Sequence, residues 1–130
     1  MIVVGYSADP YGRAALEHGI EEAKLRGTTL KVINSTTGEA YADPRFARSG
    51  EVHDVEKHLA DCGVKFELSQ PVGVDTADEL LKAMDGADAE LLVIGIRHRT
   101  PVGKLLLGSV SQQLLLECPK PVLAVKPDSF

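Results

Sequence analysis

The sequence has few cysteines and no long apolar run, and each absence excludes a class of protein. Only Cys62 and Cys118 occur in 130 residues, too few for a disulfide scaffold, so we expect two reduced thiols. No stretch approaches the ~18 apolar residues of a membrane-spanning helix. The first residues, Met1 to Gly5, lack a basic segment before their apolar run and therefore indicate a strand, not a signal peptide. These features favour a soluble cytoplasmic protein.

The sequence also has fewer basic residues than acidic ones. Acidic residues outnumber basic ones by 19 to 14, which gives a formal net charge of −5 and argues against nucleic acid or an anionic membrane as the partner. His53 and His58 do not share a face of their predicted helix, so no metal site follows. A chain of this length buries a core without metal or disulfides, and we expect residues 1–130 to form a single domain.

Apolar periodicity predicts strands and helices that alternate along the chain. Short apolar or β-branched runs predict strands over residues 2–6, 28–33, 64–70, 90–95 and 121–125. Apolar residues spaced by three and four predict helices over residues 10–27, 52–62, 76–84 and 109–118. Asp9 is predicted to cap the first helix, and capping boxes are predicted at Thr76 to Glu79 and Ser109 to Gln112. Residues 34–50 are too irregular to assign, and a loop of this length is usually functional.

This alternation predicts an α/β fold, a doubly wound five-stranded parallel sheet in the order 3-2-1-4-5 with two helices on each face. Ligands of such sheets bind beyond the carboxyl ends of the strands, where the strand order reverses. The flanking loops here are residues 5–10 and 95–109. The last strand, Pro121 to Val125, would be an edge that is apolar on both faces, and we expect it to pair with its copy in a homodimer.

The loop after the fourth predicted strand is cationic. It carries Arg97, Arg99 and Lys104, and the sequence has no acidic residue between Glu90 and Glu117. A cationic, glycine-bearing loop that leads into a helix N-terminus favours an anionic ligand, above all a phosphate. The same residues can also arise without a ligand, since loop charges are usually solvated and Ser109 is a good N-cap by itself. Both alternatives stay open.

The spacing of Gly95, His98 and Gly108-Ser109 resembles the motif G-x2-G-x9-G-[ST] of the universal stress protein family, many of whose members bind ATP or AMP. The resemblance covers essentially the whole chain, including the start IVVGYSADPYGRAAL and the end KPVLAVKP. Two positions depart from the ATP-binding pattern. Ser7 stands where those members usually carry an aspartate, and His98 replaces the second glycine of the motif.

The resemblance implies an adenine nucleotide alpha hydrolase-like fold and a site for ATP or AMP, with magnesium as a companion of ATP. It implies that Gly5, Tyr6 and Ser7 line the adenosine end, with Val32 or Ile33 beside the base. No acidic residue is clearly placed to hold the metal. The residues implied to hold ribose and phosphates are Gly95, Arg97, His98, Gly108, Ser109 and Val110.

Residues for efficient catalysis are missing. The stretch from Gly5 to Asp9 nearly matches the G-x-S-x-G nucleophile elbow, but Asp9 replaces the second glycine. We therefore expect a nucleotide-binding protein of stress response or signalling, with slow ATP hydrolysis at most. The alternative is a dimeric interaction module of the same family that has lost nucleotide binding. An enzyme of the related hydrolase fold is disfavoured, because the serine- and glycine-rich loop after its first strand is absent here.

Overall fold

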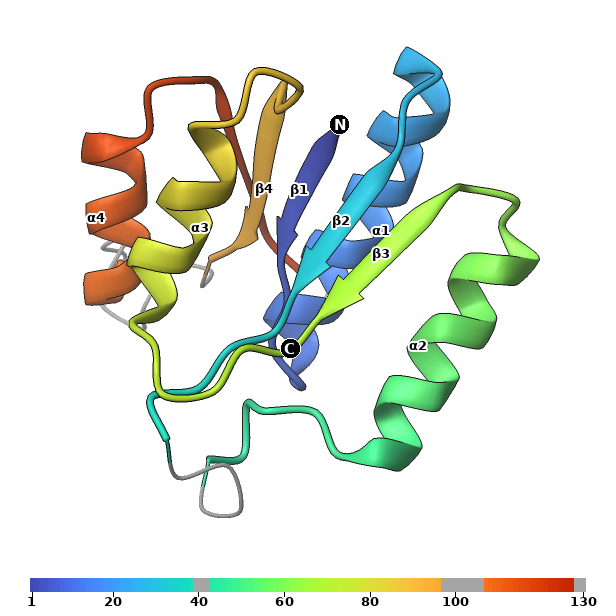
Figure 1. Ribbon diagram of the computed structural model, residues 1–130, viewed down its shortest axis with the longest axis horizontal. Coiled ribbons are helices and arrows are strands. Elements are labelled where there is room, and N and C mark those ends of the chain that lie inside the picture. The colour runs from blue at the N-terminus through green and yellow to red at the C-terminus, as the bar shows by residue number, and fades with distance from the viewer. Residues whose placement is uncertain (39–42, 97–106, 128–130) are drawn as a thin grey trace.

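The computed structural model describes residues 1–38, 43–96 and 107–127, in which strands and helices alternate (Figure 1). The strands in these ranges are β1 (Ile2–Gly5), β2 (Leu30–Ile33), β3 (Phe66–Ser69), β4 (Leu91–Gly95) and β5 (Val122–Val125). The helices are α1 (Pro10–Arg26), α2 (Ser49–Asp61), α3 (Thr76–Met84) and α4 (Ser109–Glu117). Every predicted element is therefore present, although α2 begins earlier than predicted, inside the stretch that the sequence left unassigned.

The described strands form one parallel sheet in the order β3-β2-β1-β4-β5, which confirms the predicted topology. The central strand β1 pairs with both β2 and β4, so that Ile2 lies opposite Leu30 on one side and Leu91 on the other. The strand order reverses between β1 and β4, because the chain winds outward from β1 in both directions. A ligand site is therefore expected at the carboxyl ends of these two strands.

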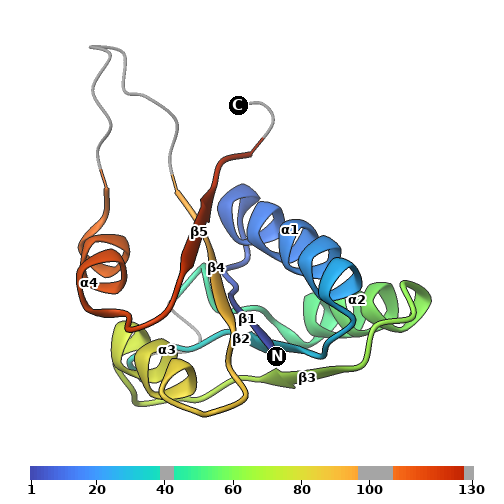
Figure 2. The ribbon, with the colours of Figure 1, turned by 90° about the horizontal axis from the view of Figure 1, so that it is seen from above.

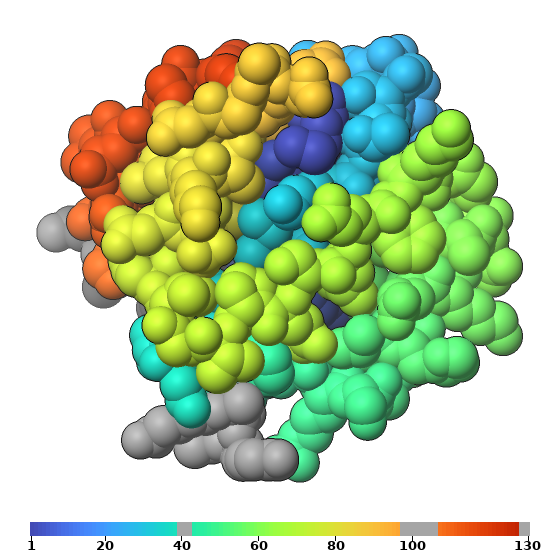
Figure 3. Space-filling model, viewed as in Figure 1, coloured from blue at the N-terminus to red at the C-terminus, as the bar shows by residue number. Residues whose placement is uncertain are grey.

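The described helices form two layers, with α1 and α2 on one face of the sheet and α3 and α4 on the other (Figure 2). Successive side chains of a strand point to opposite faces. Accordingly Ile2 and Val4 pack with α1 and α2, whereas Val3 packs with α3 and α4. The prediction of two helices on each face is confirmed for the part of the chain that the structure describes. Figure 3 shows the β3 side of the molecule, where this edge strand lies between α2 and α3.

Two of the three predicted helix caps are wrong. The predicted cap of α1 is confirmed, since the Gly12 N–H donates to Asp9 Oδ1 at 2.9 Å. However, α3 and α4 begin at Thr76 and Ser109 themselves, and no side chain caps either helix. The Thr76 hydroxyl instead accepts a hydrogen bond from Ser35 Oγ at 3.0 Å, which joins α3 to the end of β2. The N–H groups in the first turns of both helices thus donate no hydrogen bond to the side chain of an N-cap residue.

Candidate functional site

A cleft of about 440 Å³ opens where the strand order reverses. Its walls come from the carboxyl ends of β1, β2 and β4 and from the N-terminal ends of α3 and α4. Sites for small molecules in proteins have volumes of roughly 300–1,000 Å³, so the cleft is large enough for one nucleotide-sized ligand.

The cleft brings together most of the site residues that were predicted from the sequence. Lining it are Gly5, Tyr6, Ser7, Ile33, Gly95, Gly108, Ser109 and Val110. Val32 is not among them, because it is fully buried with the core residues on the α1 and α2 face of the sheet. Neighbouring residues of a strand face opposite sides, so only Ile33 of this pair reaches the cleft. Arg97 and His98, like Arg99 and Lys104, lie outside the described residues.

The wall next to α4 carries the backbone N–H groups of a helix N-terminus. Ser109, Val110 and Ser111 line the cleft in the first turn of α4, where the N-cap residue is Gly108 and no side chain caps the helix. The first N–H groups of a helix have no partner within the helix, and they carry the positive end of its dipole. This wall can therefore bind an anionic group such as a phosphate.

The end of β1 has a short polar network in place of a free carboxylate. The Ser7 hydroxyl donates to Asp9 Oδ1 at 2.8 Å, and the same oxygen accepts the Gly12 N–H at 2.9 Å. Asp9 also lines the cleft. The Ser7 hydroxyl proton is thus committed to Asp9, while the Ser7 oxygen can still accept a hydrogen bond.

Gly95 and Gly108 have different structural environments. A Cβ atom on Gly95 would lie 2.1 Å from the backbone oxygen of Tyr11, so the absence of a side chain lets α1 pack against the end of β4. A Cβ atom on Gly108 would meet no heavy atom of the described residues within 4 Å. The backbone of Gly108 is ordinary as well, with φ −66° and ψ 162°. Packing therefore explains Gly95, whereas it does not explain Gly108.

Several residues of the cleft were missed by the sequence analysis. The polar ones that follow β2 or lie at the start of α3 are Asn34, Ser35, Thr37, Asp43, Arg45, Asp75 and Thr76. Carboxylates of Asp9, Asp43 and Asp75 are thus present in the cleft, where the sequence indicated no clearly placed acid. Within the described ranges, no three acidic, histidine or cysteine side chains lie close enough to hold a metal ion together. The sequence did hold one signal, since polar residues directly after a buried strand belong to the ligand edge of the sheet.

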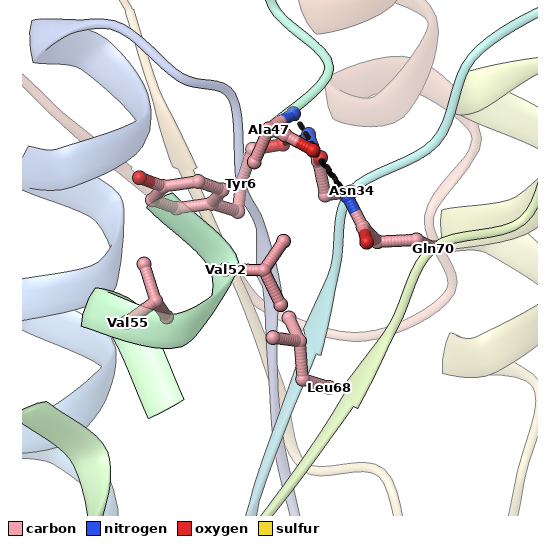
Figure 4. Close-up of a pocket in the computed structure, with 7 residues that line it drawn as sticks. All are labelled: Tyr6, Asn34, Ala47, Val52, Val55, Leu68 and Gln70. Carbon is pink, nitrogen blue, oxygen red and sulfur yellow. Dashed lines mark hydrogen bonds between the residues drawn. The ribbon is translucent and has the colours of Figure 1, made fainter. Parts of the chain in front are cut away.

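Tyr6 connects the end of β1 to α2. Its hydroxyl donates to Glu51 Oε1 at 3.0 Å, and Arg13 Nη2 donates to the same oxygen at 3.1 Å. Burial, followed by the hydrogen bond and the negative charge of Glu51, raises the pKa of Tyr6 from 10.0 to about 12. The small hollow beside the ring, lined by residues such as Val55 and Leu68, is too small to admit water (Figure 4).

The raised pKa of Tyr6 predicts a loss of stability at high pH. Between pH 10.0 and about 12 the unfolded chain loses this proton while the folded protein keeps it. The contribution is therefore fully present below pH 10.0 and is lost as the pH rises through about 12. The free energy of unfolding in urea is expected to fall less steeply with pH across this range for Tyr6→Phe than for the original protein. Equal falls in this free energy would contradict the assignment.

Comparison with known proteins gives a consistent result. Residues 1–126 match the model of the universal stress protein family. Over 130 residues the chain is 78% identical to a universal stress protein of Mycolicibacterium smegmatis, with 100% of both sequences covered. It is similar to the solved structure of a universal stress protein from Archaeoglobus fulgidus, with 30% identity, a TM-score of 0.70 and coverage of 96% of this chain and 97% of the other. A structure of the universal stress protein from Archaeoglobus fulgidus in complex with dAMP has 26% identity, a TM-score of 0.64 and coverage of 96% of each chain.

Proposed function

The chain belongs to the universal stress protein family, and from this premise we propose that it binds an adenine nucleotide, ATP or AMP, in the cleft between β1 and β4. Its sheet has the adenine nucleotide alpha hydrolase-like arrangement of the solved relatives. One observation carries the proposal. The uncapped first turn of α4 forms a wall of a cleft of about 440 Å³, at the point where ligands of such sheets bind.

In this proposal the two ends of the nucleotide meet different walls. Gly5, Tyr6 and Ser7 line the adenosine end, with Ile33 rather than Val32 beside the base. Ribose and phosphates lie toward β4 and α4, and a magnesium ion enters with ATP. The residues assigned to that end are Gly95, Arg97, His98, Gly108, Ser109 and Val110. The complex of a relative with dAMP supports an adenine nucleotide as the ligand class.

The proposed role is binding and signalling in the stress response, in the cytoplasm and without efficient catalysis. Asp9, the carboxylate nearest in sequence to Ser7, accepts two hydrogen bonds at the start of α1. Ser7 is thus hydrogen-bonded to a helix cap, and no histidine of the described residues is hydrogen-bonded to it as the base that activates a nucleophilic serine. We expect ATP hydrolysis to be slow or undetectable. Steady release of phosphate or pyrophosphate from ATP would contradict this part of the proposal.

The experiment that tests nucleotide binding uses protein purified without added nucleotide. The protein is denatured and the released small molecules are analysed. The stripped and refolded protein is then titrated with ATP and AMP by calorimetry, with GTP as the matched control. We expect released adenine nucleotide or micromolar affinity for ATP or AMP, and weaker binding of GTP. No release and no binding at millimolar ATP would favour the dimeric interaction module, in which Ser7 and His98 mark a lost site.

We also propose that the protein is a homodimer joined through β5. This strand pairs only with β4 among the described strands, and Val122, Leu123 and Ala124 are all partly exposed. An open apolar edge is an aggregation hazard unless it is paired or covered. Sedimentation equilibrium is expected to give a mass of twice 13.9 kDa. A mass of one chain at high protein concentration would contradict the dimer and leave the nucleotide site unaffected.

A further inference from the structure

Asn34, at the carboxyl end of β2, uses its side chain to join three segments of the chain. Only 2% of this residue is exposed. Its Nδ2 donates to the backbone oxygens of Tyr6 at 2.9 Å and Arg45 at 3.0 Å. Its Oδ1 accepts the Ala47 N–H at 2.7 Å and Gln70 Nε2 at 3.0 Å (Figure 4). The amide thus has four hydrogen bonds, and it connects the ends of β1 and β3 to residues 45–47.

Further hydrogen bonds hold the same segment. The Ala8 N–H donates to the Arg45 oxygen at 2.9 Å, and Gln70 Nε2 donates to the Ala47 oxygen at 2.9 Å. Residues 45–47 belong to no helix or strand. Their backbone is nevertheless held by hydrogen bonds to Ala8, Asn34 and Gln70. Side chains carried by this segment are therefore presented from a rigid backbone, although the local sequence gives it no regular structure.

The anchored segment places a charged pair at the cleft. Asp43 and Arg45 both line the cleft. Among the described residues that line it, Arg45 is the only basic one. Arg45 Nε lies 3.6 Å from Asp43 Oδ1, and the Arg45 backbone N–H donates to the same oxygen at 3.0 Å. The Arg45 side chain is 71% exposed, so N–H groups of its guanidinium remain accessible. The pair follows β2, on the side of β1 opposite to β4, whereas α4 follows β4.

We propose that Arg45 and Asp43 contact the nucleoside part of the bound nucleotide, and that Asn34 is the positioning residue that holds them there. This inference rests on the proposed function. A guanidinium beside a carboxylate is a poor phosphate site, since the carboxylate repels a second anion. The same pair suits a neutral polar group, because the guanidinium donates to ring nitrogens or stacks on a base while the carboxylate accepts from hydroxyl or amino groups.

The first test compares ligands that differ only in phosphate number. Adenosine, AMP and ATP are titrated into the original protein, Arg45→Ala and the matched control Arg48→Ala, which removes a nearby exposed arginine that does not line the cleft. Arg45→Ala is expected to weaken all three ligands by the same factor, roughly tenfold or more. Arg48→Ala is expected to bind like the original protein.

The outcomes separate this inference from the proposed function. If the original protein binds none of the three ligands, the proposed function is contradicted, and the present inference is overturned with it. If it binds them and Arg45→Ala binds equally well, only the present inference is overturned. A loss that grows from adenosine to ATP would also overturn it, because Arg45 would then contact phosphate.

The second test asks whether Asn34 acts through Arg45. Asn34→Ala is expected to weaken nucleotide binding. The double variant, Asn34→Ala with Arg45→Ala, should have the same affinity as the weaker-binding of the two single variants, because both changes remove the same contact. Losses that multiply would overturn the positioning role. If Asn34→Ala does not fold, the half-buried Gln70→Ala replaces it in the same cycle, because it removes only the bonds to Asn34 and Ala47.

Discussion

Replacing Gly108 with valine is expected to weaken ATP and AMP binding at least about a hundredfold, which corresponds to roughly 2.7 kcal/mol. Gly108 precedes the uncapped first turn of α4 and lines the cleft. A side chain there extends into open space, because a Cβ atom would meet no heavy atom of the described residues within 4 Å. That space is where the proposed ribose and phosphates lie, so the valine methyl groups would compete with the ligand.

The fold should tolerate this substitution. The backbone of Gly108, with φ −66° and ψ 162°, is accessible to any residue, and loss of a glycine N-cap costs about 1 kcal/mol at most. Gly108→Ala is the matched control, because it loses the same cap with a smaller side chain and should bind with intermediate affinity. Calorimetry with ATP and urea unfolding on both variants provide the two readouts. Unchanged affinity in a folded Gly108→Val protein would refute the proposed position of the site.

Replacing Gly95 with alanine is expected to have the opposite effect, a large loss of stability. The added Cβ would lie 2.1 Å from the Tyr11 oxygen, 2.5 Å from its carbonyl carbon and 2.9 Å from its Cα. These are backbone atoms of α1, so relief requires the helix to move away from β4. Overpacking of a close contact usually costs about 1–3 kcal/mol and sometimes more, and we expect at least the upper end here because no flexible side chain can yield.

The free energy of unfolding in urea measures this effect, with Gly108→Ala as the matched glycine substitution that should change it by about 1 kcal/mol at most. Both glycines belong to the same sequence motif, so the comparison separates packing from ligand contact. If Gly95→Ala were as stable as the original protein but failed to bind nucleotide, Gly95 would serve the ligand and its assignment to packing would be wrong.

The order of the strands could be predicted because it depends on local patterns. Strands and helices alternate along the chain, and parallel strands joined by right-handed crossovers leave few possible arrangements. The caps of α3 and α4 could not be predicted in the same way. Thr76 is engaged by Ser35, a residue far away in the sequence, and such a hydrogen bond outweighs a local capping preference.

The candidate site was only partly predictable for a similar reason. The motif placed Gly95 and Gly108 at one location, but only the packing of α1 onto β4 distinguishes their roles. Val32 and Ile33 were equivalent in the sequence until the structure showed which face of β2 borders the cleft. Arg45 was missed because its position depends on the buried amide of Asn34, and no short-range pattern reveals that contact.

The pairing of β1 with β4 has a consequence for how the protein folds. Ile2 lies opposite Leu91, so the two strands that border the cleft come from distant parts of the chain and meet only after a large loop has closed. Contacts of such high sequence separation form slowly. The cleft is complete only once this pairing exists, so a ligand bound there selects the native state and does not assist the early steps of folding. It would raise stability by mass action and slow unfolding, leaving the rate of folding nearly unchanged.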